Sequence, residues 1–123
     1  MTNDACEVLL VSAEWQSRAL LLAELQEGGY GATALPGMSL ALRALATGRV
    51  RPDVVLIEAT PDLHVRPINV EQMLGLLEGV PVILVVGAYD AADFEPLRER
   101  VAALLRRPIR VGSIVAEVRN LCD

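Results

Sequence analysis

The sequence has no lysine, one histidine, two cysteines and four aromatic residues among its 123 positions. All eleven basic residues are arginine, which excludes every mechanism that needs a lysine amine, such as Schiff-base chemistry or a lysine general base. The longest apolar run covers residues 80–86, counting Pro81, and is far shorter than the roughly 20 residues of a membrane-spanning helix. No segment has the pattern of a signal peptide. We therefore expect a cytoplasmic protein that makes no membrane contact.

The two cysteines, Cys6 and Cys122, stand at opposite ends of the sequence. Two are too few for a disulfide scaffold, and a chain of this length can build a hydrophobic core without one. Because disulfides are rare in a reducing cytoplasm, we expect free thiols, although the two ends of an α/β chain can lie close together. His64 has no Cys or His near it in the sequence, so we expect an exposed loop residue rather than a metal ligand. No metal site and no cofactor is predicted.

The charge is negative overall and unevenly distributed. The formal net charge is −5, so the domain as a whole is expected to repel nucleic acid and anionic membranes. Residues 98–123, however, hold six of the eleven arginines and only three acidic residues. This basic end is either a solvated surface of mixed charge or a contact surface for a partner. The residues predicted for such an interaction face are Arg98, Arg100, Arg106, Arg110, Glu117 and Arg119.

Short apolar runs alternate with helical patterns along the chain. Hydrophobic residues, mostly Leu, Val and Ala, make up 53% of the sequence, as expected for one domain spanning residues 1–123. The runs predict strands over residues 8–11, 32–35, 54–57, 80–86 and 103–105. Helices are predicted over residues 14–27, 39–47, 69–78, 93–101 and 111–121. Ser12 and Asn69 are the expected caps of the first and third helices, and the first helix is expected to face inward through Ala19, Leu22, Ala23 and Leu25.

Strands that are apolar throughout and alternate with helices indicate an α/β fold, a doubly wound five-stranded parallel sheet with helices on both faces. In such folds the functional site lies at the carboxyl ends of the strands, near the point where the strand order reverses. The residues placed there by the predicted elements are Ser12, Ala13, Glu14, Glu58, Ala59, Val86, Gly87 and Arg107.

Three of these strand ends carry a family pattern. The run RPDVVLIE at residues 51–58 resembles the segment that leads to the phosphoacceptor aspartate in receiver domains of bacterial response regulators, the CheY-like family. Residues 80–83 are similar to the fourth strand of that family, and Arg107-Pro108 stands where the family has Lys-Pro. The resemblance covers essentially the whole chain and implies the flavodoxin-like fold.

The residues that carry the family's chemistry differ in this sequence. The resemblance places the metal-binding acidic pair at Ser12 and Ala13, with Glu14 nearby, and the phosphoacceptor at Glu58. It places the hydroxyl residue at Val86, the lysine at Arg107 and the switch aromatic at Leu104. One carboxylate beside an alanine is a poor Mg²⁺ site, and valine has no hydroxyl to donate. We therefore expect a degenerate phosphoacceptor pocket with no catalytic residue, and a chain that is not an enzyme.

Glu58 and Arg107 allow two interpretations. A lasting contact between carboxylate and guanidinium would stand in for a phosphoaspartate held by lysine. Alternatively, Glu58 caps a loop in water. Ser12 likewise either caps a helix or donates to a bound anion.

Three functions follow from the resemblance and these departures. The first is a phosphorylation-independent pseudo-receiver, a protein-interaction module in bacterial signal transduction or transcriptional control. Its partner is another protein or a second copy, docked through the fourth helix, fifth strand and fifth helix. The second is a phosphoaccepting receiver, and the third is a small-molecule sensor that uses the strand-end pocket. Because 123 residues leave no room for an output domain, the chain is expected to be a regulatory domain of a longer protein.

Overall fold

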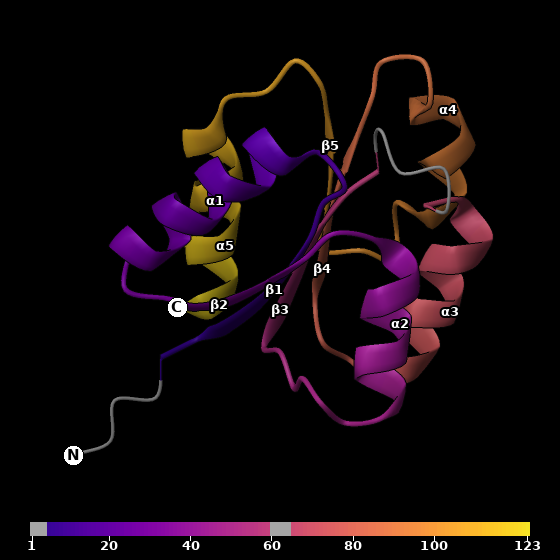
Figure 1. Ribbon diagram of the computed structural model, residues 1–123. Helices are drawn as coiled ribbons and strands as arrows, with labels where there is room; N and C mark the ends of the chain where they lie inside the picture. The colour runs from indigo at the N-terminus through magenta and orange to yellow at the C-terminus, as the bar shows by residue number, and fades with distance from the viewer. Residues whose placement is uncertain (1–4, 60–64) are drawn as a thin grey trace.

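Five parallel strands form one sheet in the computed structural model, which describes residues 5–59 and 65–123 (Figure 1). The order across the sheet is β2-β1-β3-β4-β5. The strands are β1 (Glu7–Val11), β2 (Gly31–Leu35), β3 (Val54–Glu58), β4 (Val82–Val86) and β5 (Ala103–Arg106). The helices are α1 (Trp15–Glu27), α2 (Met38–Ala46), α3 (Pro67–Leu77), α4 (Ala91–Phe94) and α5 (Val111–Cys122), with a 3₁₀ turn, η1 (Glu95–Leu97), after α4. The predicted fold class is confirmed.

The sheet is covered on both faces, and each face has its own core. Helices α1 and α5 pack on one face, and α2, α3 and α4 pack on the other (Figure 1). Alternate residues of the central strand β3 divide between these cores: Val54 and Leu56 face α1 and α5, while Val55 and Ile57 face α2 and α3. Both faces of β3 are therefore shielded from water, which explains why residues 54–57 are all apolar. No helix among the described residues is long and apolar enough to cross a membrane.

Two predicted elements differ from the structure because of proline. Strand β4 begins at Val82 rather than at residue 80, since Pro81 has no N–H for the ladder and contributes only its carbonyl, which accepts from Val55 N–H at 3.0 Å. The single helix predicted over residues 93–101 is instead the four-residue α4 followed by η1. Pro96 has no N–H to continue the α-helical ladder, so the α-helix ends at Phe94 although Glu95 keeps helical backbone angles.

The inward face of α1 also differs from the prediction. Leu21 and Leu25 are its buried residues, whereas Ala19 and Ala23 are exposed. Ser17 lies one turn before Leu21 and donates its hydroxyl to a carboxylate at the end of β3. The helix therefore turns the stripe formed by residues 17, 21 and 25 toward the sheet.

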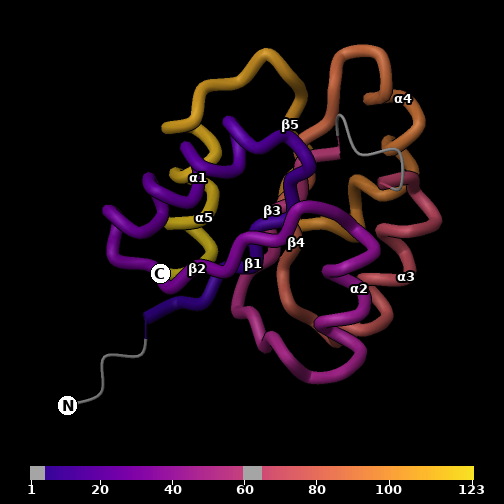
Figure 2. The backbone as a smooth tube through the Cα atoms, in the orientation of Figure 1, coloured from indigo at the N-terminus to yellow at the C-terminus, as the bar shows by residue number. Residues whose placement is uncertain are grey.

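The expectation of free thiols is wrong for this structure, because Cys6 and Cys122 form a disulfide. The start of β1 and the end of α5 lie at the same edge of the sheet, as the tube in Figure 2 shows, and the two Cα atoms are 5.8 Å apart. That separation suits a disulfide. The expectation of free thiols rests on a reducing cytoplasm alone, whereas the topology of the fold places Cys6 and Cys122 close enough for a disulfide. The disulfide closes a chain segment with a sequence separation of 116 residues.

We expect reduction of the disulfide to lower the free energy of unfolding by about 3–5 kcal/mol, because the unfolded chain gains entropy when so long a loop is opened. Urea denaturation of the native protein with and without a reductant measures this loss. The double variant Cys6→Ser/Cys122→Ser is the control and should not respond to the reductant. Two thiols that react with a thiol reagent in the folded, unreduced protein would contradict the disulfide.

Candidate functional site

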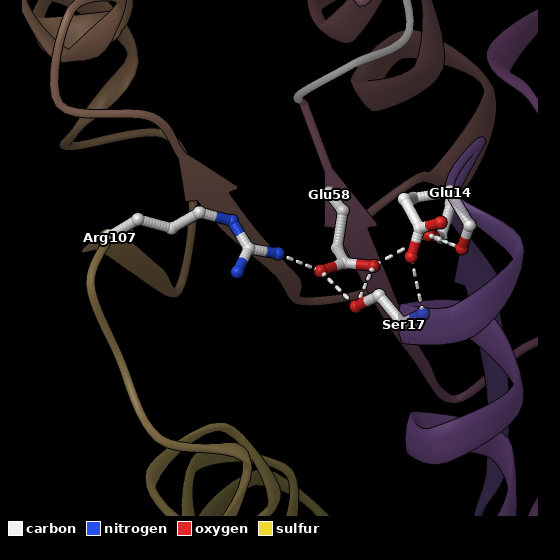
Figure 3. Close-up of polar contacts among 5 residues, drawn as sticks. Glu14, Ser17, Glu58 and Arg107 are labelled. Carbon is white, nitrogen blue, oxygen red and sulfur yellow. Dashed lines mark hydrogen bonds and ion pairs between the residues drawn. The ribbon is translucent and has the colours of Figure 1, made fainter.

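The carboxyl edge of the sheet brings together side chains from four separate segments. The strand order changes direction between β1 and β3, which is where doubly wound folds form a crevice. Ser12 follows β1, Glu58 ends β3, Ser17 lies in the first turn of α1, and Arg107 follows β5. Figure 3 shows Arg107 approaching the Glu58 carboxylate from one side while Ser17 approaches from the other.

The Glu58 carboxylate is buried and fully engaged. Only 1% of the residue is exposed. Ser12 Oγ donates to Oε1 at 2.5 Å, and Ser17 Oγ lies 2.8 Å from Oε1 and 2.7 Å from Oε2. Arg107 Nη2 forms an ion pair with Oε2. Both carboxylate oxygens therefore accept from protein donors, and the buried negative charge has a cationic partner.

The alternation of β3 explains why Glu58 meets α1. Glu58 continues the positions of Val54 and Leu56, which face α1 and α5. Val86, the position of the family's hydroxyl residue, is fully buried in the opposite core beneath α2, α3 and α4. Leu104, the position of the switch aromatic, packs against the same opposite core. The structure thus places Ser12, Glu58 and Arg107 together and directs Val86 to the other face of the sheet.

The cap of α1 is Glu14, not Ser12. The Glu14 side chain accepts from Ser17 N–H at 2.7 Å, while the Ser12 side chain is completely buried and points to Glu58. A hydroxyl beside a buried carboxylate forms a charge-assisted bond that is stronger than a bond to a neutral backbone group, so Ser12 is drawn away from the helix end. Arg18 Nη1 donates to the Ser12 carbonyl at 2.9 Å, which fixes the turn between β1 and α1.

Ser17 is the site residue that the sequence prediction missed. It stands at the top of the stripe that continues to Leu21 and Leu25, and a polar residue at the end of such an apolar stripe is the signal that identifies it. The predicted inward face of the helix runs through Ala19 and Ala23, and Ser17 does not lie on that face. Ala13, the second metal position of the family, is half-buried and has no oxygen in its side chain.

The donor set of this edge does not fit Mg²⁺. The ion prefers carboxylate oxygens in near-octahedral geometry, whereas the two family positions hold Ser12 and Ala13. Glu14 is used as a helix cap, and the Glu58 oxygens accept from Ser12, Ser17 and Arg107. Within residues 5–59 and 65–123, no three His, Cys, Asp or Glu side chains are grouped as metal ligands would be.

The residues predicted for an interaction face divide into two groups. Arg98 forms an ion pair with Glu95 at 2.7 Å, and Arg100 forms one with Glu71 at 3.3 Å. The hydrogen bond from Arg98 lowers the pKa of the Glu95 carboxyl and raises the pKa of the Arg98 guanidinium. The second group has no ion pair in the described part of the chain. It consists of three exposed arginines, Arg106, Arg110 and Arg119, and the half-buried Glu117. His64, predicted to lie in an exposed loop, falls outside the described residues.

Comparison with known proteins identifies the fold. No protein-family model matches the sequence, and no curated protein matches it. A response regulator receiver domain from Clostridium thermocellum superposes with a TM-score of 0.81 at 17% identity, covering 95% of this chain and 94% of that one. A response regulator receiver protein from Pseudomonas putida gives 0.79 at 19% identity, covering 97% and 99%. The chain has the receiver-domain fold.

A further structure with the same receiver fold is described as adenylate cyclase from Rhodopirellula baltica. It superposes with a TM-score of 0.83 at 14% identity, covering 96% of this chain and 87% of that one. At such identities the likeness concerns the path of the backbone. The chemistry of the receiver fold in this chain must therefore be argued from its own residues.

Replacing Arg107 by Gln should lower the free energy of unfolding by about 1–3 kcal/mol, because Glu58 loses its cationic partner while it stays buried. The cost falls below that of a fully buried pair because the Arg107 side chain is 36% exposed. The matched control is Arg106→Gln, one residue earlier and exposed. Urea denaturation of both variants measures the difference, and equal stabilities would show that the Glu58–Arg107 contact contributes nothing.

Proposed function

We propose that this domain is a phosphorylation-independent receiver that acts as a protein-interaction module in bacterial signal transduction or transcriptional control. The observation that carries the proposal is the state of Glu58. The residue at the phosphoacceptor position is buried and is held by two hydroxyls and a guanidinium from its own chain.

The same contacts support a single lasting conformation. A carboxylate acting as a nucleophile must present a free oxygen to the phosphorus, but both Glu58 oxygens already accept hydrogen bonds. Phosphoryl transfer also depends on cations and donors arranged around the transferred group. In this chain the Glu58 carboxylate already binds the available cation, Arg107, and the hydroxyls of Ser12 and Ser17. The network thus occupies the place that a phosphorylated residue and its ligands would take.

The proposed contact surface is the side of the domain formed by β5 and α5. Arg106, Arg110 and Arg119 are exposed there and have no ion pair among residues 5–59 and 65–123. Unpaired guanidiniums suit an acidic surface on a partner protein, or the acidic body of a second copy. A direct nucleic-acid partner is not proposed, since the domain is acidic overall. The prediction of a cytoplasmic location stays a prediction, and the Cys6–Cys122 disulfide weighs against it.

Incubation with acetyl phosphate and Mg²⁺ should leave the mass of the protein unchanged, because Glu58 has no free oxygen and the edge has no magnesium ligands. Intact-protein mass spectrometry measures this, with a receiver domain known to autophosphorylate as the positive control. A phosphoryl adduct on Glu58 would overturn the proposal and favour a phosphoaccepting receiver.

Charge reversal at Arg110 or Arg119 should weaken partner capture or self-association about tenfold, since a favourable charge contact becomes a repulsive one. Arg43→Glu, an exposed arginine on α2, is the matched control. Light scattering across protein concentrations tests self-association, and capture from the native cell extract tests a protein partner. Equal self-association and equal partner capture by all three variants would contradict the β5–α5 surface as the contact surface.

A further inference from the structure

A second group of charged residues lies at the amino edge of the sheet, at the opposite end of the strands from Glu58. A hollow of about 190 Å³ opens there between the first strands and the loop that connects α2 to β3. Its charged and polar lining comes from Glu7 at the start of β1, Thr33 in β2, and Arg49 and Arg51 in the loop. It is separate from the Glu58 network in both residues and position.

Beside the hollow, the edge strand β2 carries small residues opposite Glu7 and Leu9 of β1. Gly31 pairs with Glu7, and Thr33 pairs with Leu9. A Cβ atom at Gly31 would lie 2.1 Å from a Glu7 carboxylate oxygen, so the Glu7 side chain reaches back over β2 only because residue 31 is glycine.

The backbone of Glu7 is held on its other side by Asp53. The Asp53 carboxylate accepts from Glu7 N–H at 2.9 Å, and Asp53 N–H donates to the Glu7 carbonyl at 2.7 Å. The Glu7 backbone is therefore held by the α2–β3 loop, and its exposed side chain lies against Gly31 of β2.

The charged residues that line the hollow form no ion pairs within the described part of the chain. Arg98, Arg100 and Arg107 each form an ion pair elsewhere in the molecule. By contrast, Glu7, Arg49 and Arg51 line one hollow, yet in the part of the chain that the structure describes they form no ion pair, with one another or with any other residue. Opposite charges that share a hollow without meeting are complementary to a ligand that carries both signs.

We propose that this hollow binds a small amino dicarboxylate of the aspartate type. Two guanidiniums suit two carboxylates, and Glu7 suits one ammonium group. The Thr33 hydroxyl adds a donor and acceptor at the wall. The small volume of the hollow, about 190 Å³, suits a ligand of the size of a small metabolite. This binding site is independent of the role proposed for Glu58.

Isothermal titration calorimetry of the full chain with L-aspartate, succinate, glycine and inorganic phosphate tests the proposal. We expect aspartate to bind at least tenfold more tightly than succinate, which lacks the ammonium, and than glycine, which lacks the second carboxylate. Glu7→Gln should abolish the preference for aspartate over succinate. Arg49→Gln and Arg51→Gln should each weaken aspartate binding about tenfold, and Arg43→Gln on α2 should leave it unchanged.

Two results would overturn the proposal. One is the absence of measurable aspartate binding to the native protein. The other is binding of succinate or phosphate as tight as that of aspartate and unaffected by Glu7→Gln, which would show a plain anion site. If Glu7→Gln does not fold, as circular dichroism would show, the comparison of aspartate with succinate on the native protein and on Arg51→Gln decides the question.

Discussion

A carboxylate buried in a protein must receive hydrogen bonds and a counter-charge, because an unpaired ion costs several kcal/mol in apolar surroundings. Glu58 imposes this requirement at the end of β3, a strand that is buried along its whole length. Its donors are distant from it in the sequence: Ser12 and Ser17 lie 46 and 41 residues before Glu58, and Arg107 lies 49 residues after it. The hydrogen bonds and the ion pair of Glu58 therefore join the β1–α1 turn, the first turn of α1 and the end of β5.

The two edges of the sheet use their charges in opposite ways. At the carboxyl edge, Glu58 and Arg107 form an ion pair, and both Glu58 oxygens accept hydrogen bonds from the protein. At the amino edge, Glu7, Arg49 and Arg51 surround a hollow without pairing. On the proposed function, the contacts of this domain with other molecules are expected away from the carboxyl edge of the sheet.

The sequence predicts the architecture well because doubly covered parallel strands are continuous apolar runs, which alternate visibly with helices. The sequence also predicts that Glu58 and Arg107 lie at the carboxyl edge of the sheet, because both follow predicted strands. The rotation of α1 was not predictable in the same way. Ala19 and Leu21 are both apolar, and the hydrogen bond of Ser17 to Glu58 decides which stripe turns inward. The Cys6–Cys122 bond does not follow from an expected cytoplasmic location, because it depends on the topology that brings the two chain ends together.

A double-mutant cycle between Glu58→Gln and Arg107→Gln tests the central claim most directly, with the free energy of unfolding as the measured quantity. If the buried carboxylate depends on the guanidinium, the loss caused by Arg107→Gln should shrink once residue 58 is neutral. The expected coupling energy is about 1–3 kcal/mol. Losses that add to within about 0.5 kcal/mol would contradict the account, because the two side chains would then not depend on each other.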